Sequence, residues 1–171
     1  TLLAVRSAAE MDRYVGANTR VVDLDGRLAV PGFIEGHGHH MGMGQAQMQL
    51  DPLGTASWGR VVSQVDSSAD ETASGAWVEG RGWHQETWTS TPERMVRGFP
   101  TNARLNEAAP DTPVYLTHAS GHAAIANDAA LEAAGTGPNT PDPAGGPIVR
   151  DAQERATGVP LQTAAGLVQQ A

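Results

Sequence analysis

Three of the six histidines in this chain lie within four positions, in the segment PGFIEGHGHH of residues 31–40. An apolar run comes directly before them, so we expect a strand over residues 27–37 that ends at the histidines. On a strand, side chains two positions apart share a face and lie about 6.5–7 Å apart along the chain. His37 and His39 would therefore point the same way, and two imidazoles can converge on one divalent cation. The alternative is a polar turn in which the same histidines form hydrogen bonds.

Strands and helices are predicted to alternate along the rest of the chain. Apolar residues at helical spacing between positions 58 and 65 predict one helix, and β-branched runs bounded by Gly or Pro predict strands. The dipeptides Asp25-Gly26 and Gly145-Gly146 have the composition of hairpin turns. This alternation favours an α/β fold with parallel strands, preceded by a small β unit. The predicted strands are 2–5, 19–24, 27–37, 77–83 and 113–122, the predicted helical segments are a turn at 7–16 and helices at 57–73, 101–109, 123–135 and 162–171, and a loop is predicted at 135–147.

The composition excludes several classes of function. The formal net charge is −8, and an acidic surface repels phosphate backbones and anionic lipids, so we expect neither a nucleic acid partner nor a membrane partner. The sequence has no cysteine, which excludes disulfides and thiolate metal ligands. It has no lysine, which excludes Schiff-base chemistry. A metal site in this chain would therefore use imidazole, carboxylate, amide and water ligands.

The segment LAVPGFIEGHGH resembles the first barrel strand of the amidohydrolase superfamily, in which a Pro-Gly-hydrophobic-acidic stretch precedes His-x-His. Four later segments are similar, in the same order, to the branch of that superfamily that contains N-substituted formamide deformylase. The His-x-His part is common to the whole superfamily, whereas the ordered set of four is far more specific. The four segments are WVEGRGWHQETW, LTHASGHAAIAND, DPAGGPIVRD and TGVPLQTAAGLV.

The resemblance implies a partial TIM-like (β/α)8 barrel of the amidohydrolase type, preceded by part of a small β-sandwich. Residues 1–30 would belong to the sandwich and residues 31–171 to the first part of the barrel. The family also takes metal-binding histidines from later barrel strands and an aspartate from the last strand, and we expect those strands to be absent from this chain. We therefore expect an incomplete amidohydrolase that self-associates or is completed by a second chain.

The same resemblance assigns His37 and His39 as ligands of a divalent metal, most simply one or two zinc ions. Metal-activated water would then hydrolyse a non-peptide C–N bond in a small amide or formamide substrate. Gln162 lies where relatives usually have an acidic residue, so it would be a further and weaker metal ligand. The alternative function is a non-catalytic fragment, either truncated or dependent on a partner chain. The N-terminus lacks a signal-peptide pattern, which predicts a cytoplasmic location.

Three further residues are predicted to bind substrate. Trp83 and His84 follow a predicted strand in one of the resembling segments and would line the pocket; the alternative is an aromatic residue packed on the barrel rim. His122 matches a Gly-His pair of the family and would hydrogen-bond a substrate carbonyl or oxyanion, unless backbone groups satisfy it. Asn127 would cap or orient the loop that carries His122, or be an ordinary helix residue.

Overall fold

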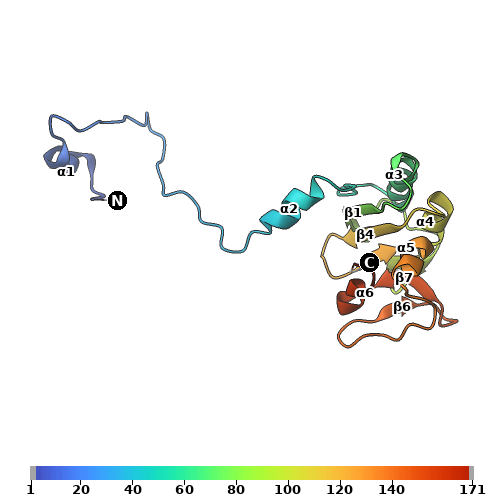
Figure 1. Cartoon of the computed structure of the whole chain (residues 1–171). Coiled ribbons are helices and arrows are strands. Elements are labelled where there is room, and N and C mark those ends of the chain that lie inside the picture. Colours follow the sequence, from blue (N-terminus) through green and yellow to red (C-terminus); the bar gives the residue numbers. More distant parts are fainter. Residues whose placement is uncertain (1–2, 170–171) are drawn as a thin grey trace. The chain divides into compact units, whose positions relative to one another are not determined.

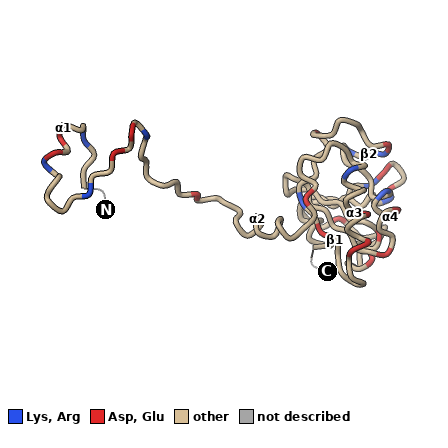
Figure 2. The backbone as a smooth tube through the Cα atoms, turned by 90° about the horizontal axis from the view of Figure 1, so that it is seen from above, with Lys and Arg blue, Asp and Glu red and all other residues tan. Residues whose placement is uncertain are grey.

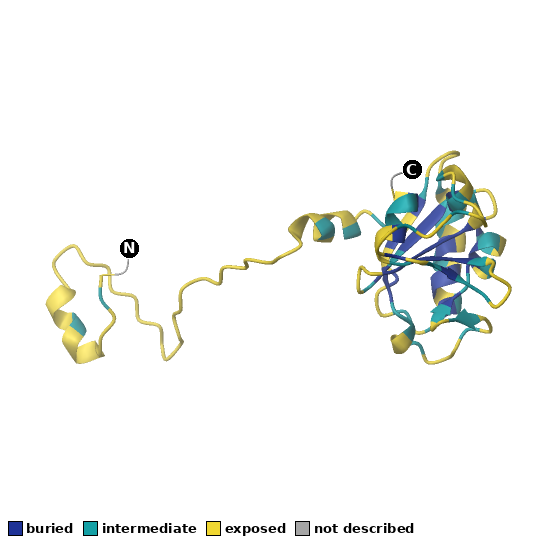
Figure 3. Ribbon diagram, turned by 90° about the horizontal axis from the view of Figure 1, so that it is seen from below, coloured by how far each residue is buried: buried dark blue, intermediate teal, exposed yellow. Residues whose placement is uncertain are grey.

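The computed structural model describes residues 3–169, and the chain divides into two compact units, residues 1–38 and residues 39–171 (Figure 1). All strands of the described residues belong to the second unit. Figure 3 shows that the two units also differ in how far their residues are buried. Side chains of residues 3–38 are almost all exposed, whereas most helices and strands of residues 39–169 contain buried residues. The packed core of the protein therefore lies in the second unit.

A single helical turn begins the first unit. Helix α1 (Ala8–Met11) continues into the 3₁₀ helix η1 (Asp12–Tyr14). The carboxylate of Glu10 accepts hydrogen bonds from the hydroxyl of Ser7 at 2.7 Å and from the backbone N–H of Ser7 at 3.3 Å. A Ser-x-x-Glu sequence favours this arrangement at the start of a helix. The predicted helical turn within residues 7–16 is therefore confirmed.

The predicted turn at Asp25-Gly26 is also present. Both residues have positive φ, 55° and 78° respectively, and the N–H of Arg27 donates to the carbonyl oxygen of Leu24 at 2.9 Å. Positive φ at both central positions is typical of the two-residue turns that join hairpin strands. The turn forms from local preference alone, because Gly adopts positive φ without steric cost and Asp tolerates it.

The strands predicted for the first unit, over 2–5, 19–24 and 27–37, are wrong wherever the structure describes them, and residue 2 lies outside the described residues. Their apolar side chains are exposed, with Phe33 at 99% and Ile34 at 95%. A strand is stable only when a neighbour completes its hydrogen bonds and another layer covers its apolar face. Residues 3–38 provide neither, so the β-branched pattern alone does not form a sheet. The assignment of this unit to a β-sandwich stays a prediction.

The second unit alternates strands and helices. Its three-stranded sheet has the order β1-β4-β5, with β1 and β4 parallel and β5 antiparallel to β4. Two further pairs, β2 with β3 and β6 with β7, are antiparallel. The strands are β1 (Val78–Trp83), β2 (Met95–Val96), β3 (Phe99–Pro100), β4 (Val114–His118), β5 (Ala124–Ala126), β6 (Ile148–Arg150) and β7 (Ala156–Pro160). The α-helices are α2 (His40–Ala46), α3 (Trp58–Glu71), α4 (Ala103–Ala108), α5 (Asp128–Ala133) and α6 (Gly166–Gln169), and the 3₁₀ helices are η2 (Gln85–Thr87) and η3 (Gln162–Ala165).

Leu50 extends the parallel part of the sheet, because it forms an isolated parallel bridge with Gly80 of β1. The chain order Leu50, α3, β1, α4, β4 contains two successive connections between parallel strands, each with a helix. The strands predicted at 77–83 and 113–122 and the α/β alternation are thus confirmed, although β4 ends at His118. Gly80 permits the close approach of these strands. A Cβ at Gly80 would lie 2.8 Å from Cδ2 of Leu116 in β4 and 2.9 Å from the carbonyl oxygen of Leu50.

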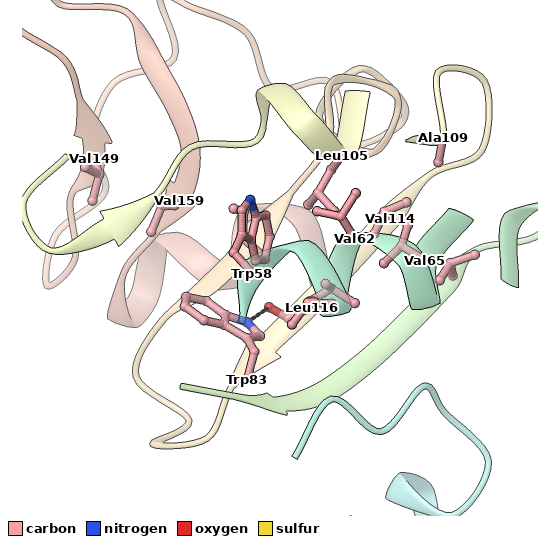
Figure 4. Close-up of a cluster of buried hydrophobic side chains, with 13 residues drawn as sticks. Trp58, Val62, Val65, Trp83, Leu105, Ala109, Val114, Leu116, Val149 and Val159 are labelled. Atoms are coloured by element: carbon pink, nitrogen blue, oxygen red, sulfur yellow. Dashed lines mark hydrogen bonds between the residues drawn. The ribbon is translucent and has the colours of Figure 1, made fainter. Parts of the chain in front are cut away.

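Helix α3 covers one face of the sheet with the apolar residues that the sequence spacing indicates. They belong to one buried cluster with Val114 and Leu116 of β4 (Figure 4). The helices predicted at 57–73 and 101–109 are confirmed, and the one predicted at 162–171 is confirmed up to Gln169, beyond which the residues are not described. No helix in the described part of the chain is both long and apolar enough to cross a membrane. The buried residues of α3 are Trp58, Val61, Val62 and Val65.

A bulge at Gly82 changes which side chains of β1 reach the core. In this strand the even-numbered positions are buried, whereas Glu79 and Arg81 are exposed. Simple alternation would place Trp83 on the exposed face with Arg81. The register of β1 against β4 shifts between Arg81 and Trp83, where Gly82 has a φ of 120°. This extra residue turns Trp83 into the core.

The helix predicted over 123–135 is wrong in its first part. Residues Ala124–Ala126 form β5, and helix α5 begins only after Asn127. The side-chain oxygen of Asn127 accepts the N–H of Ala130 at 3.0 Å, so Asn127 is the N-cap of α5 and not an ordinary helix residue. Alanine favours a helix when only neighbouring residues are considered. In the fold, residues 124–126 form backbone hydrogen bonds with the buried strand β4, and local helix propensity does not include this pairing with a distant segment.

The hairpin in the C-terminal part does not lie at Gly145-Gly146, where it was predicted. Strands β6 and β7 instead pair across a turn in which the N–H of Asp151 donates to the carbonyl oxygen of Arg155 at 2.9 Å. Gly146 has a packing role, because a Cβ there would collide with the backbone carbonyl of Leu161. The glycine is therefore required for close approach of two chain segments and does not mark the hairpin turn.

Candidate functional site

The carboxyl ends of the two parallel strands bring the loops that follow them to one edge of the sheet. Trp83, the last residue of β1, lies opposite His118, the last residue of β4. The loop after β1 begins with His84, and the loop after β4 carries Ser120 and His122. Ligands in α/β folds bind at this edge of parallel strands. The polar residues of the two loops are called the carboxyl-edge cluster here: His84, Gln85, His118, Ser120 and His122.

His118 is the central member of the cluster and is only 5% exposed. The backbone N–H of Ser120 donates to its Nδ1 at 3.1 Å, so Nδ1 carries no proton. In the neutral ring the proton is then on Nε2, which lies 3.1 Å from Oε1 of Gln85 and donates to it. These hydrogen bonds assign the tautomer of His118 and connect the loop after β1 to the loop after β4.

Burial keeps His118 neutral. Loss of hydration disfavours the imidazolium form and lowers the pKa of His118 below its ordinary value of 6.5, and the nearby His84 lowers this pKa further. The centroids of the two imidazole rings are 4.6 Å apart, so positive charge on one ring disfavours positive charge on the other. The indole of Trp83 meets the His118 ring edge to face at 4.7 Å. A neutral, tightly held His118 is suited to fixing the two loops relative to each other.

Ser120 is exposed, and its hydroxyl is oriented by two hydrogen bonds. The hydroxyl oxygen lies 2.8 Å from Nδ1 of His118, to which the hydroxyl donates, and it accepts the N–H of His122 at 3.2 Å. His122 is also exposed, so its ring is accessible to a ligand. The substrate-binding role of His122 stays a prediction, but its backbone position is well determined by Ser120.

His84 is partly buried and begins the loop after β1. Its Nδ1 accepts the backbone N–H of Glu86 at 3.2 Å and thereby caps the 3₁₀ helix η2. In the neutral ring Nε2 therefore carries the proton and is a hydrogen-bond donor. This arrangement is compatible with donation to a ligand oxygen, and the substrate-binding role of His84 stays a prediction.

Gln162 follows β7 and reaches the cluster through its backbone. Its N–H donates to the carbonyl oxygen of His122 at 2.8 Å, and its side chain is exposed. Its φ is 51°, a left-handed conformation that costs a residue with a Cβ about 1–3 kcal/mol. The structure thus brings Gln162 next to His122, whereas its assignment as a metal ligand stays a prediction.

Trp83 is a core residue. Its side chain is fully buried, and its indole N–H donates to the carbonyl oxygen of Leu116 at 2.9 Å (Figure 4). Its ring lies 6.4 Å from that of Trp58 and 6.3 Å from that of Trp88, measured between centroids. This position matches the packed aromatic residue considered as the alternative and gives no support to substrate binding by Trp83. The bulge at Gly82 is the physical reason.

His37 and His39 lie on either side of the boundary between the two units. His39 is the N-cap residue of helix α2, and the backbone N–H of His37 donates to the carboxylate of Glu35 at 2.6 Å. The shared strand face predicted for this pair is wrong, because residues 27–37 have no neighbouring strand in the described structure. The role of the two imidazoles as metal ligands stays a prediction.

The imidazole nitrogens of His37 and His39 are suitable ligands for a divalent metal, but two ligands are too few for a complete site. Imidazole nitrogen is a common zinc ligand, and zinc sites take three or four ligands from the protein. Across residues 3–169, no group of three or more His, Asp or Glu side chains is arranged to hold a metal ion. The described residues therefore provide at most part of a metal centre.

Gln85, Ser120 and the central position of His118 are not predicted from the sequence. A usable signal was nevertheless present. Both predicted strands, 77–83 and 113–122, belong to one alternating α/β pattern, so their carboxyl ends meet at the same edge. Polar residues directly after the two strands are therefore candidates for contact with one another, whatever their separation in sequence.

Comparison with protein-family models gives a match to the Amidohydrolase family over residues 20–171, which is most of the chain. The chain belongs to the amidohydrolase family. The matched residues include all three predicted metal ligands and the whole carboxyl-edge cluster. The family membership predicted from the ordered sequence segments is thereby confirmed.

Two curated relatives resemble the chain over nearly its whole length. The N-substituted formamide deformylase of Arthrobacter pascens is 36% identical over 171 residues, which cover 98% of this chain and 29% of that protein. The protein LONG AFTER FAR-RED 3 of Arabidopsis thaliana is 31% identical over 167 residues, which cover 98% of this chain and 27% of that protein. The chain thus spans less than a third of the length of these relatives.

Two solved structures resemble the fold. Both are crystal structures of uncharacterized metal-dependent hydrolases, from Pyrococcus horikoshii OT3 and Pyrococcus furiosus, with TM-scores of 0.50 and 0.51 and 21% sequence identity in each case. The first match covers 77% of this chain and 21% of that chain, and the second covers 82% and 24%. At this identity the likeness concerns the fold, and it supports the mixed α/β arrangement described above.

Proposed function

We propose that this chain forms part of a metal-dependent hydrolase that cleaves a non-peptide C–N bond in a small amide or formamide. The observation that carries the proposal is the convergence of His84, Ser120 and His122 at the carboxyl edge of parallel strands, where α/β enzymes bind their substrates. The similarity to a formamide deformylase supports the choice of bond.

For the fold, residues 31–171 would belong to the first part of a (β/α)8 barrel. Leu50, β1 and β4 provide three successive parallel positions with helices between them, which is the repeating unit of such a barrel. The antiparallel strand β5 departs from this repeat and would be an insertion after β4. Residues 1–30 would belong to an accompanying β-sandwich.

His37 and His39 would hold a divalent metal, most simply zinc, together with ligands from outside residues 3–169. When bound, such a metal supplies an activated water and polarises a carbonyl group. Gln162 would be a weaker additional ligand, because a neutral amide oxygen attracts a cation less strongly than a carboxylate does. If Gln162 binds too weakly to hold a second metal ion, the site would contain one ion instead of two.

The carboxyl-edge cluster would bind and orient the amide. Because Nδ1 of His84 accepts the N–H of Glu86, its Nε2 can donate a hydrogen bond to a substrate carbonyl oxygen, and it would stabilise negative charge that develops there. His122 is exposed and is positioned through its N–H by Ser120. His118 would not touch the substrate. It would instead hold the loop after β1 at a fixed distance from the loop after β4.

Zinc titration of the purified chain tests the metal assignment. Because two imidazoles are fewer ligands than a complete site needs, we expect weak zinc binding that depends on both His37 and His39. The double variant His37→Ala/His39→Ala should lose this binding, and His40→Ala, at the adjacent histidine, should retain it. Competition against a chromophoric chelator measures the affinity, and elemental analysis measures the metal content. Equal zinc binding by the wild type and the double variant would contradict the assignment.

A second candidate is a non-catalytic or split-barrel chain that needs a partner. The exposure of Phe33 and Ile34 favours it, as does the lack of a three-donor metal group within residues 3–169. Co-purification of a second polypeptide that restores tight zinc binding and formate release from N-alkyl formamides would support this candidate. Formate release by the chain alone, abolished by His37→Ala, would exclude it.

A further inference from the structure

The two faces of strand β1 differ in what covers them. The residues of β1 at even positions face the core under α3, whereas Glu79 and Arg81 are exposed. Arg81 pairs in register with Thr117 of β4, one residue before the end of that strand. The side chain of Arg81 therefore starts close to the carboxyl edge, on the face that the helix α3 does not cover.

Arg81 extends to the loop that carries two members of the carboxyl-edge cluster. An ideal Cβ added to Gly121 would lie 3.4 Å from Nη2 of Arg81, so the guanidinium group lies against the backbone of this loop. Gly121 is the residue between Ser120 and His122, and its φ is 73°. The glycine thus serves a left-handed turn and also leaves room for the guanidinium group.

The guanidinium group of Arg81 has no carboxylate partner within the described residues. The nearest acidic residue on the same face of β1 is Glu79, and its carboxylate accepts a hydrogen bond from Nε2 of Gln49 at 2.8 Å. The ion pairs formed within residues 3–169 are Arg150 with Asp142 and Arg155 with Asp151, and neither includes Arg81. An unpaired arginine therefore stands beside Ser120 and His122.

A guanidinium group presents its N–H donors in a planar fork that matches the two oxygens of a carboxylate. We infer that Arg81 binds a carboxylate group of the substrate and thereby selects small amides that carry a negative charge, such as N-acyl amino acids. This inference rests on the proposed function, because it names the substrate class of the same site. A single guanidinium matches one planar monoanion, and a phosphate dianion is usually met by more than one cation.

A separate cavity beside α3 and α4 contains charges of both signs. Its volume is about 450 Å³, and it is lined by Arg94 and Arg104 together with Glu93 and Glu107. Figure 2 shows basic and acidic positions together over α3, α4 and the segment of β2. Two charges of each sign do not select an anion, so this cavity provides a matched control for Arg81.

The test compares two small amides of nearly the same size and shape, one with a carboxylate and one with a neutral carboxamide in its place. N-formylglycine carries a carboxylate, and N-formylglycinamide is its neutral counterpart. Each is titrated into ¹⁵N-labelled chain in a buffer with chelator, so that no metal captures the carboxylate, and backbone amide shifts are followed. We expect saturable shifts at Ser120, Gly121 and His122 with N-formylglycine, and affinity for the neutral amide that is lower by about tenfold or more, since a charge-assisted hydrogen bond contributes about 1.5–3 kcal/mol.

Variants then assign the effect to one side chain. Arg81→Gln should lower the affinity for N-formylglycine to that for N-formylglycinamide, Arg81→Lys should lower it less, and Arg94→Gln should leave it unchanged. Arg81 is exposed, so these changes leave the core intact. Equal affinity for the two amides, an unchanged affinity in Arg81→Gln, a loss in Arg94→Gln, or no saturable shift at Gly121 would each overturn the inference.

Hydrolysis separates this inference from the proposed function. Charge-selective binding that depends on Arg81, without formate release in the presence of zinc and any completing chain, would leave the inference standing and count against the proposed reaction. Formate release from neutral and anionic amides at equal rates would support the reaction and overturn the role of Arg81.

Discussion

Asn127 connects three parts of the second unit through one side chain. Its Oδ1 accepts the N–H groups of Val114 at 2.9 Å and Ala130 at 3.0 Å, and its Nδ2 donates to the carbonyl oxygens of Ala109 at 2.7 Å and Thr112 at 2.9 Å. The residue is fully buried. Without this side chain, several of these backbone groups would be buried without a hydrogen-bond partner, which costs about 1–3 kcal/mol for each group.

We therefore expect Asn127→Ala to lower the free energy of unfolding by about 3 kcal/mol or more, because it removes a helix cap and leaves buried polar groups unsatisfied. Urea denaturation followed by circular dichroism measures the change. Asn139→Ala is the matched control, since Asn139 is exposed and should tolerate the substitution. A loss of less than about 1 kcal/mol in Asn127→Ala would mean that water replaces the side chain.

The lowered pKa of His118 makes stability depend on pH. The unfolded chain binds this proton near the ordinary value of 6.5, whereas burial and the adjacent His84 lower the pKa of His118 in the folded chain. Protonation therefore favours the unfolded state. The contribution of His118 to stability is complete above pH 6.5 and is lost as the pH falls from 6.5 toward the lowered pKa.

We expect the free energy of unfolding of the wild type to fall more steeply between pH 7 and pH 5 than that of His118→Gln. Urea denaturation across this range measures the difference, and His122→Gln, at an exposed histidine, should keep the steep dependence. An NMR titration of the imidazole gives an independent value. A pKa for His118 at or above 6.5 would contradict the assignment of a neutral, buried ring.

For single residues, the sequence indicates which side chains can act in a site more reliably than it indicates the direction in which those side chains point. His84 and His122 were predicted as site residues, and they do lie at the same edge of the sheet. Trp83 was predicted there too, but the extra residue at Gly82 rotates it into the core. A one-residue register shift depends on how β1 meets β4, and no pattern within β1 alone reveals it.

Among the elements, β7 packs closely on its neighbours because of one glycine. Gly158 has a φ of 81°, and a Cβ there would lie 2.5 Å from the carbonyl oxygen of Ala126 and 2.5 Å from Cβ of Asn102. Asn102 in turn donates to the Ala126 carbonyl oxygen at 3.1 Å and is the residue directly before α4. Gly158 thus stands where β5, β7 and α4 meet.

We expect Gly158→Ala to destabilise the chain by about 2–4 kcal/mol, because it combines an unfavourable φ with a steric clash against backbone. Thermal and urea denaturation measure the loss. Gly137→Ala is the control, since nothing lies within 4 Å of a Cβ at Gly137 and no positive φ is involved there. If the two alanine variants unfold at the same urea concentration, the close packing of β7 on β5 is not a significant source of stability.

The elements that were predicted correctly are those whose pattern is local. The helical spacing from Trp58 to Val65 identifies α3 and its buried face, because the period of 3.6 residues is visible within one segment. β5 was missed because its alanines favour a helix and only the partner strand β4 makes it extended. The strand predicted at 19–24 is wrong for the opposite reason. Its β-branched residues favour a strand, but the described residues contain no partner strand beside it.

For the whole chain, the exposed apolar side chains of residues 21–34 are the feature that bears most on its behaviour in solution. Large exposed apolar patches are uncommon on soluble monomeric proteins and tend to associate. The formal net charge of −8 opposes contact between identical chains. Added salt screens that repulsion and so shifts the balance toward association. The exposed residues are Val21, Val22, Leu24, Leu28, Val30, Phe33 and Ile34.

We therefore expect the chain to self-associate in a concentration-dependent way, and more strongly at 0.5 M salt than at 0.05 M. Sedimentation velocity at several protein concentrations measures the extent. Phe33→Ser/Ile34→Ser should weaken association by at least tenfold, because burial of each large apolar side chain contributes about 1.5–3 kcal/mol.

The control for that variant is Met43→Ser/Met48→Ser, which removes two other exposed apolar side chains, 69% and 82% exposed, from the second unit. It should associate as the wild type does if residues 21–34 carry the contact. A wild type that sediments as a single 17.8 kDa species at every concentration and salt tested would show that the apolar segment is satisfied within one chain. It would also remove the main physical reason to look for a completing partner, because the residues now exposed would then be covered without one.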